Sequence, residues 1–307
     1  MRKLVLAIIF LVCFTLYNCL PLEKFRQEIT IQIEDNTISK EEIHTQLSKR
    51  LDAYDIKLIS SKNLGNNQLK LVCGFYDDIP SDAVIVLLET PGKIGFHLGL
   101  EQRQISKLHN QLDQLIASEI QKDTSFFKGE SNESVFSPKF KNIVKNYVGI
   151  YQNSAQPMIE SFLKTKTIDS ILSSYITDYT YTFNYNKVHN NISLYVYDKK
   201  VYLTGANIIE AHHSFDQMAK NSINIQFDEI GTKKFEKLTN QAMSQGRTIP
   251  IIYEQQLLVS PMVATPIKEG SAQITGVFTD REIKEKVAIL KSGTLPKIHV
   301  KSVTVVK

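Results

Sequence analysis

Alternating apolar and polar positions near the N-terminus predict a strand that is buried on one face. In residues 28–33 every second side chain is isoleucine, and the period then changes to one apolar residue in four, which is typical of a helix. Ser39 and Glu42 form a capping-box pattern at the start of this helix. Residues 28–100 are thus predicted to form a ferredoxin-like β-α-β-β-α-β unit, with elements at 28–33, 39–54, 56–60, 68–74, 80–89 and 94–100.

The middle of the chain, residues 105–202, combines helical and strand periods. Apolar residues at helical spacing predict a helix from Ile105, and a polar stretch predicts a loop at 122–138. The elements predicted after it are helices at 140–150 and 156–163 and a β-hairpin with strands at 179–185 and 192–203. All aromatic residues of the first hairpin strand fall on one face: Tyr179, Tyr181, Phe183 and Tyr185.

Residues 203–296 predict a second α/β unit. Its strands are expected at 223–227, 248–253 and 257–262, with a helix at 229–244 that ends at Gly246. Thr279 and Glu282 form a second capping box, before a helix that ends at Gly293. The tail, residues 298–306, alternates again and is expected to be a final strand.

The first residues carry the pattern of an export signal. A Met-Arg-Lys start precedes an apolar run from Leu4 to Leu16, which is shorter than the roughly 20 residues of a spanning helix. Cys19 follows this run and resembles a lipoprotein processing site with Leu16 at −3, although Tyr17 and Asn18 replace the usual small residues. Cys19 is therefore the candidate lipidation residue, and a cleaved signal at 1–19 is favoured over a retained N-terminal anchor.

Composition narrows the classes of function. The 36 Lys and Arg residues are balanced by 32 Asp and Glu residues, both signs are mixed along the chain, and a nucleic-acid partner is not expected. After processing, Cys73 would be the remaining thiol, so it is expected to be a small core residue rather than part of a disulfide. No later segment has the composition of a membrane span, and the protein is expected in the cell envelope, membrane-anchored and facing the periplasm or the exterior.

No group of residues predicts catalysis. His212 and His213 would point to opposite faces if they lie in a strand, and Asp77-Asp78 and Asp216 lack partners at the spacing of a metal loop. The segment 270–276 contains two glycines but not the lysine of a phosphate loop. We therefore expect no catalytic, metal or cofactor-binding residues, and a protein that is not an enzyme.

The aromatic row of the hairpin, Tyr179, Tyr181, Phe183 and Tyr185, is the candidate polypeptide-binding surface. Aromatic side chains beside a sheet edge suit an extended polypeptide, because backbone hydrogen bonds give affinity and side chains fill pockets. The alternative is that the row packs on the helical insert, since tyrosines are well suited to the border of a core. The sequence leaves both interpretations open.

Several runs in the C-terminal third resemble a known family. They are LTGA at 203–206, FD at 215–216, GTKKF at 231–235, SP at 260–261, GSAQITGVFT at 270–279 and SGTLP at 292–296. Their order and spacing resemble the head subdomain of the first periplasmic domain of SecD and fused SecDF proteins. Residues 51–56 and 92–98 are similar to the base subdomain of the same family.

The resemblance implies an α+β fold with two ferredoxin-like units, a base and a head, separated by a helical and β-hairpin insert. The implied domains are a base at 20–104 completed by 297–307, an insert at 105–202 and a head at 203–296. Three features depart from the family: 21–27 lack its glycine-rich motif, Glu254-Gln255-Gln256 replaces an Asp-Gly turn, and the chain stops at Lys307 without the membrane domain. Proton-driven work is therefore not implied for this chain.

Two functions are consistent with these patterns. The first is a non-enzymatic extracytoplasmic accessory of Sec-dependent protein export, which binds translocating or unfolded polypeptide and has the Sec translocon as a further partner. The alternative is an envelope lipoprotein with a structural or interaction role, which retains the SecD periplasmic fold without an export function. Co-purification of the export channel would favour the first.

Overall fold

The computed structural model describes residues 25–34, 38–77, 79–122, 147–186 and 189–306. The predicted signal, Cys19 and the loop predicted at 122–138 lie outside these residues, apart from Lys122. The chain forms two compact units, which we describe separately. Unit 1 comprises the residues up to Pro91 together with those from Leu295 onwards, and unit 2 is Gly92–Thr294.

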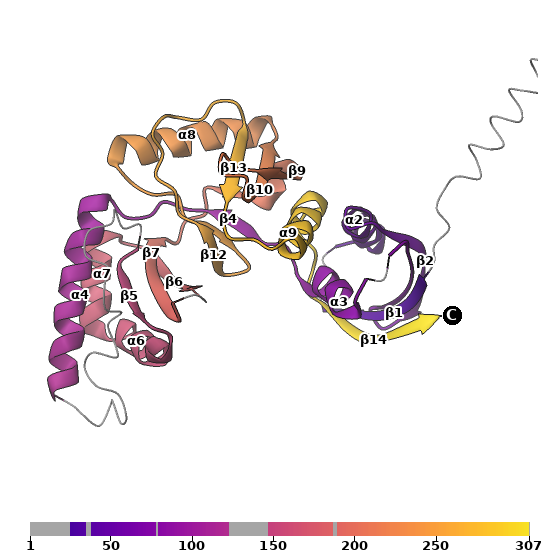
Figure 1. Cartoon of the computed structure of the whole chain (residues 1–307), viewed down its shortest axis with the longest axis horizontal. Coiled ribbons are helices and arrows are strands. Elements are labelled where there is room, and N and C mark those ends of the chain that lie inside the picture. Colours follow the sequence, from indigo (N-terminus) through magenta and orange to yellow (C-terminus); the bar gives the residue numbers. More distant parts are fainter. Residues whose placement is uncertain (1–24, 35–37, 78, 123–146, 187–188, 307) are drawn as a thin grey trace, which may run out of the picture. The chain divides into compact units, whose positions relative to one another are not determined.

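Unit 1 contains one antiparallel sheet with two helices on one face (Figure 1). Its elements are β1 (Phe25–Ile33), α2 (Lys40–Asp52), β2 (Ile56–Gly65), β3 (Gln68–Phe75), α3 (Ser81–Glu89) and β14 (Ile298–Val306). The strand order is β14-β1-β3-β2, and each neighbouring pair is antiparallel. The strands and helices predicted between residues 28 and 89 are therefore confirmed.

The core of unit 1 follows from the two sequence periods. The isoleucines of β1 and the apolar stripe of α2 are buried, and Cys73 of β3 is buried with them. Burial raises the pKa of the Cys73 thiol to about 12, so the residue behaves as a small apolar side chain. The fully buried Arg50 of α2 donates hydrogen bonds to the carbonyls of Leu87, Thr90 and Pro91, where its positive charge complements the C-terminal end of α3.

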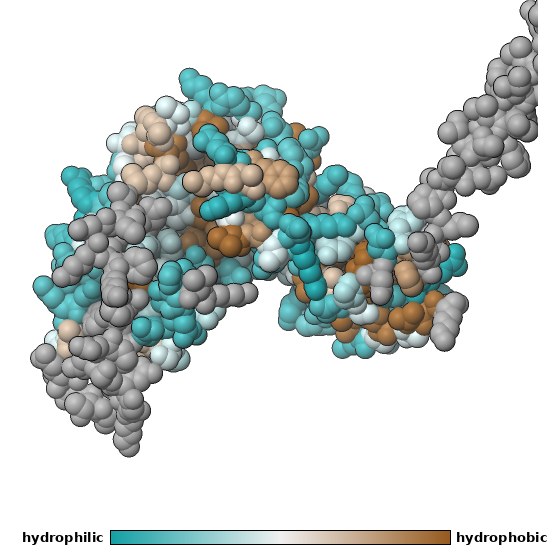
Figure 2. Space-filling view, viewed as in Figure 1, coloured by the Kyte–Doolittle hydropathy of each residue, from teal (hydrophilic) through white to brown (hydrophobic). Residues whose placement is uncertain are grey.

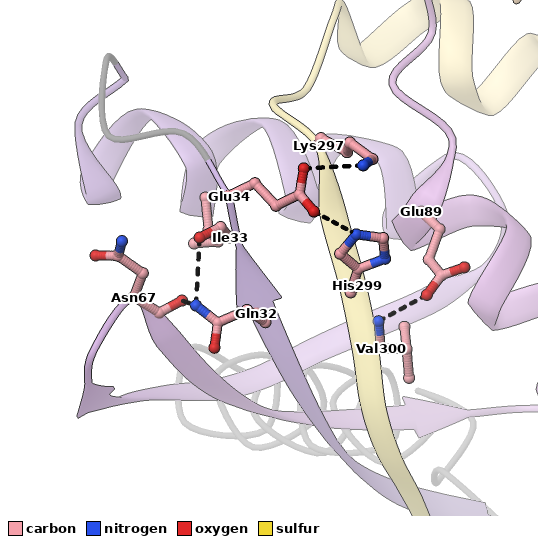
Figure 3. Close-up of polar contacts among 8 residues, drawn as sticks. All are labelled: Gln32, Ile33, Glu34, Asn67, Glu89, Lys297, His299 and Val300. Atoms are coloured by element: carbon pink, nitrogen blue, oxygen red, sulfur yellow. Dashed lines mark hydrogen bonds and ion pairs between the residues drawn. The ribbon is translucent and has the colours of Figure 1, made fainter.

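The tail strand β14 completes the sheet of unit 1. It pairs with β1 from Ile298 opposite Ile33 to Val306 opposite Arg26. The alternation predicts this strand, and the family resemblance implies its place in the first sheet. At its start Glu34 accepts hydrogen bonds from the side chains of Lys297 and His299, at 2.9 and 2.6 Å (Figure 3). These contacts join the first and last strands of the chain.

The described residues of unit 2 form three small sheets. The first has the order β13-β10-β9, the second β12-β11-β4-β8 and the third β5-β7-β6. Its helices are α4 (Gln102–Lys122), α6 (Gln156–Leu163), α7 (Lys166–Tyr175), α8 (Glu229–Gln245) and α9 (Asp280–Ser292). Its strands are β4 (Ile94–Phe96), β5 (Gly149–Gln152), β6 (Tyr179–Asn186), β7 (Asn191–Asp198), β8 (Leu203–Thr204), β9 (Ile208–Phe215), β10 (Asn221–Phe227), β11 (Ile251–Tyr253), β12 (Gln256–Val259) and β13 (Ser271–Thr275).

Three predicted elements of this region differ from the structure where it describes them. Residues 94–100 do not close the first sheet, because Ile94–Phe96 pairs with β11 and β8 in unit 2. Of the helix predicted at 140–150, residues 140–146 lie outside the described residues, and residues 149–150 belong to β5, which pairs with β7. The return strand predicted at 192–203 is divided between β7 and β8, which belong to different sheets. In each case partners distant in sequence override the local pattern.

The helix end predicted at Gly246 and the helix start predicted at Thr279 are confirmed in unit 2. Thr279 and Glu282 form both hydrogen bonds of a capping box at the start of α9, and Gly246 ends α8 with a left-handed φ of 61°. At Ser39 in unit 1 the side chain accepts from the Glu42 amide, which is one half of the predicted box.

Candidate functional site

A groove of about 900 Å³ in unit 2 is lined by two residues of the aromatic row, Tyr181 and Phe183. One wall is β6, from which four consecutive residues, 180–183, line the groove. Consecutive residues of a strand point to opposite faces, so a cavity that contacts all four runs along the edge of the strand. Strand β6 is the last strand of its sheet among the described residues.

The opposite wall consists of strands β4 and β8 and the turn that follows β8. Strand β8 is also the last strand of its sheet, in the order β12-β11-β4-β8. The lining residues here are small or β-branched: Ile94, Gly95, Val201, Thr204, Gly205 and Ala206. Gly95 is closely packed, because a Cβ atom at this position would lie 2.8 Å from Nε2 of His97. The groove therefore lies between the exposed edges of two sheets.

The turn Glu254-Gln255, which stands where the resembling family has an Asp-Gly turn, contributes Gln255 to the lining of this groove. Both residues have left-handed backbone angles, with φ of 46° and 67°, in a two-residue hairpin between β11 and β12. The Glu254 carboxylate accepts hydrogen bonds from the amides of Gly92 and Lys93, each at 2.6 Å. The Gln255 carbonyl accepts from the Thr182 hydroxyl at 3.0 Å. These bonds offset the cost of the left-handed angles and connect the two walls.

The aromatic row of β6 is divided by the structure. Tyr179, Tyr181 and Phe183 pack against a core formed by α4, α6, α7 and β7, and Tyr181 and Phe183 also line the groove. The Tyr179 hydroxyl donates to Asp169, and burial together with this carboxylate raises the pKa of Tyr179 to about 12. Tyr185 is 47% exposed and donates to Asn190. Tyr181 and Phe183 therefore fit both interpretations of the sequence, because they pack on the core and also line the candidate binding groove.

Charged groups in the groove are few. Lys93 and Lys199 contribute two positive charges to its lining, and Glu160 contributes one negative charge. His97 is almost fully buried, and burial lowers its pKa against the smaller opposing effect of the Asp198 and Lys200 backbone. His97 is therefore neutral at physiological pH, with Nδ1 3.0 Å from the Asp198 carbonyl.

His213 and Asp216, two of the residues that the sequence raised as candidates for metal binding, have hydrogen-bond partners. His213 contacts the side-chain oxygen of Asn221 through Nε2 at 2.7 Å, while His212 precedes it on β9 and points to the opposite face. Asp216 accepts from the amides of Met218 and Lys220 in the β9–β10 turn. Within the described residues no three His, Cys, Asp or Glu side chains are placed to share a metal ion.

On the face shown in Figure 2, apolar residues of the described chain form separate patches among hydrophilic ones. Scattered exposed apolar residues are normal on a folded protein. Among the helices that the structure describes, none is both long and apolar enough to cross a bilayer.

Comparison with known proteins confirms the predicted resemblance. Residues 180–297 match the family model described as SecDF, P1 head subdomain. The translocase subunit SecD of Acidaminococcus fermentans is 39% identical over 94 residues, which is 31% of this chain and 22% of that protein. SecDF of Thermus thermophilus is 33% identical over 94 residues, 31% of this chain and 12% of that protein. The chain thus spans at most about a fifth of these relatives.

The likeness in fold extends further than the likeness in sequence. A crystal structure of SecDF in a super-membrane-facing form matches 92% of this chain and 31% of that chain, with a TM-score of 0.53 and 15% identity. Nearly the whole chain therefore shares a mixed α/β fold with a SecDF region. The matched family segment begins at residue 180, within β6, so it includes the strand that forms one wall of the groove.

Sequence reasoning identified β6 but missed the rest of the groove. Its lining residues come from segments around positions 95, 181, 205 and 255, which are far apart along the chain. The absent Asp-Gly turn was the single local sign of the site, because Gln255 lies in the groove. The position of the remaining residues depends on sheet pairing, which no local pattern encodes.

Proposed function

We propose that this protein is a non-enzymatic, extracytoplasmic accessory of Sec-dependent export that binds translocating or unfolded polypeptide in the groove beside β6. The observation that carries the proposal is the course of this groove along the free edge of β6, whose lining residues 180–183 belong to the segment that matches the SecDF head. Free sheet edges bind extended chains, since both partners present unpaired backbone groups.

The arrangement of unit 1 supports the rest of the assignment. Its element order β-α-β-β-α-β and its strand order β14-β1-β3-β2 are those of a ferredoxin-like base, which we propose for this unit. The strands of the region proposed as the head are divided between two sheets, and we propose the ferredoxin-like description for the base alone. We further propose that Cys19 carries a lipid, which would hold both units at the membrane surface near the Sec translocon.

The proposed binding is passive. A sheet edge in a groove can retain a chain segment only through mass action on the bound state, so its expected role is to bind the emerging chain and hinder its return. The few charges in the lining suit a site that accepts many sequences, because backbone groups are common to all of them.

The proposal is tested by filling the groove. Ala206 is exposed on the wall opposite β6, and Ala206→Trp would place a large side chain in the space without altering the core. Ala264→Trp adds the same side chain at an exposed position that does not line the groove. Reduced, carboxymethylated α-lactalbumin, a permanently unfolded protein, serves as the probe in a fluorescence anisotropy titration.

We expect Ala206→Trp to weaken binding at least about tenfold, equivalent to about 1.4 kcal/mol, and Ala264→Trp to leave it unchanged. Equal binding by both variants would contradict the assignment of the groove. Failure of the unsubstituted protein to bind the probe would contradict the function itself.

A further inference from the structure

We propose that the groove binds its polypeptide by strand addition, with the backbone of the bound segment paired to Tyr181 and Phe183 of β6. This inference rests on the proposed function and specifies how the chain is held. It assigns the recognition to backbone groups, whereas the aromatic side chains of the same residues pack on the core of unit 2.

The pairing of β6 with β7 determines which backbone groups are free. In an antiparallel pair, alternate residues exchange hydrogen bonds with the partner strand, and the residues between them direct their N–H and C=O groups to the other side. The Lys199 amide donates to the Asp178 carbonyl at 2.9 Å, just before the first residues of the β6–β7 ladder. The bonded residues of β6 are therefore the even-numbered ones, and Tyr181 and Phe183 face away from β7.

The far side of β7 gives an independent check. The Asn190 carbonyl accepts from the Asn153 amide at 3.2 Å, and the Asp198 amide donates to the Leu98 carbonyl at 2.8 Å. The backbone groups of the even-numbered β7 residues thus form hydrogen bonds on the side away from β6. The backbone groups of the odd-numbered β7 residues therefore face β6. In the observed register Tyr195 lies opposite Thr182, and Tyr197 opposite Thr180. Both sides of β7 give the same assignment.

The free backbone groups open into the groove. Tyr181 and Phe183 both line it, and within the described residues no hydrogen bond involves their N–H or C=O groups. Two donors and two acceptors therefore repeat along the wall at the two-residue spacing of a strand. An extended polypeptide presents the complementary set at the same spacing, and a compact small molecule does not.

The surroundings permit the approach of another backbone. Thr204, Gly205 and Ala206 on the opposite wall are small, and Gly205 lacks a side chain altogether. The Thr182 hydroxyl is held by the Gln255 carbonyl, which fixes the direction of the β6 edge. The occupant that these features select is an unfolded segment with a free backbone edge, largely independent of its side chains.

Amide hydrogen exchange tests the inference directly. The full-length protein carries ¹⁵N on tyrosine, phenylalanine and threonine, and the probe is a capped peptide of about six residues of valine, serine and threonine, the usual length of a strand. We expect the peptide to slow exchange at the amides of Tyr181 and Phe183 at least about tenfold at saturation. The amides of Thr180 and Thr182 serve as internal controls, because they are already bonded to β7. A second peptide, N-methylated at every amide, should not bind.

The possible results separate this inference from the proposed function. Displacement of unfolded α-lactalbumin by the peptide without protection of Tyr181 and Phe183, or equal binding of the methylated peptide, would overturn strand addition and leave the binding function intact. Slow exchange at Tyr181 and Phe183 before any peptide is added would mean that another part of the chain covers the edge, and would also overturn it. Absence of any binding would contradict both proposals.

Discussion

At the scale of single residues, Gly270 shows why the run at 270–279 begins with a glycine. Gly270 has a left-handed φ of 68°, and a Cβ atom there would lie 2.2 Å from the Thr232 hydroxyl oxygen. Its carbonyl also accepts the Phe227 amide at 2.8 Å, at the end of β10. Both Thr232 and Gly270 belong to runs shared with the SecD head. The glycine at position 270 is therefore required by a close contact between α8 and the start of β13.

Gly246 provides a matched control for this contact. It has a similar φ of 61°, but no atom lies within 4 Å of the position a Cβ would take. Gly246→Ala should lower the free energy of unfolding by about 1 kcal/mol, the cost of a left-handed alanine. Gly270→Ala should cost clearly more than this, because the clash with Thr232 is added. Urea unfolding measures both, and equal losses would show that the Thr232 contact is unimportant.

At the scale of elements, the hydrophobic period predicted those helices and strands that bury one face and expose the other. The isoleucines at every second position of β1 and the stripe of α2 predicted their structure correctly, since one face of each packs on a core. The same reasoning missed β9, which is mostly exposed and has no clean alternation. It also placed Ile94–Phe96 in the wrong sheet, because the sequence of a short buried strand does not show which strand it pairs with.

The candidate site was predictable only in part, for a related reason. The aromatic row of β6 was visible in the sequence, yet the direction of its free backbone groups depends on the parity of its pairing with β7. Parity is set by the register of the hairpin, and a shift of one residue would reverse it. No property of Tyr181 or Phe183 alone could show that their amides face the groove.

The double role of Phe183 leads to a prediction about stability. Its ring packs against the core and lies 6.0 Å from the Tyr181 ring, whereas Tyr185 is half exposed in the same row. Phe183→Ser should therefore lower the free energy of unfolding by about 2 kcal/mol, less than for a fully buried ring. Tyr185→Ser should change it by no more than about 0.5 kcal/mol. Thermal melts that rank the two variants in the opposite order would contradict the placement of the row.

The junction of β1 and β14 should respond to acid through Glu34. Hydrogen bonds from Lys297 and then His299 hold the pKa of this carboxyl below its ordinary value of 4.5. A lowered folded-state pKa adds stability that is present above the unfolded pKa and lost as the pH falls through the folded one. The Glu34→Gln variant should thus be less stable than the unsubstituted protein at neutral pH and similar to it at about pH 3.

The control for this prediction is Glu210→Gln, which alters an exposed glutamate of β9. Denaturant unfolding at both pH values should show little difference for this variant. A stability gap for Glu34→Gln that persists unchanged in acid would mean that the carboxylate charge does not act at this junction.

At the scale of the whole molecule, the two units divide the proposed work. Unit 1 is a sheet closed by the last strand of the chain, so the residues on both sides of unit 2 are fixed in one structure. Unit 2 carries the groove and the segment that matches the SecDF head. We propose that unit 1 is a support and that contact with the exported chain takes place in unit 2.

Site-specific photo-crosslinking in cells tests this central claim most directly. The photoreactive residue is placed at Val201, which lines the groove and is 46% exposed, or at Val277, which is fully exposed in unit 2 and does not line it. An exported protein arrested during translocation should crosslink to position 201 and much less to position 277. Equal crosslinking at both positions, or crosslinking only at 277, would contradict the account.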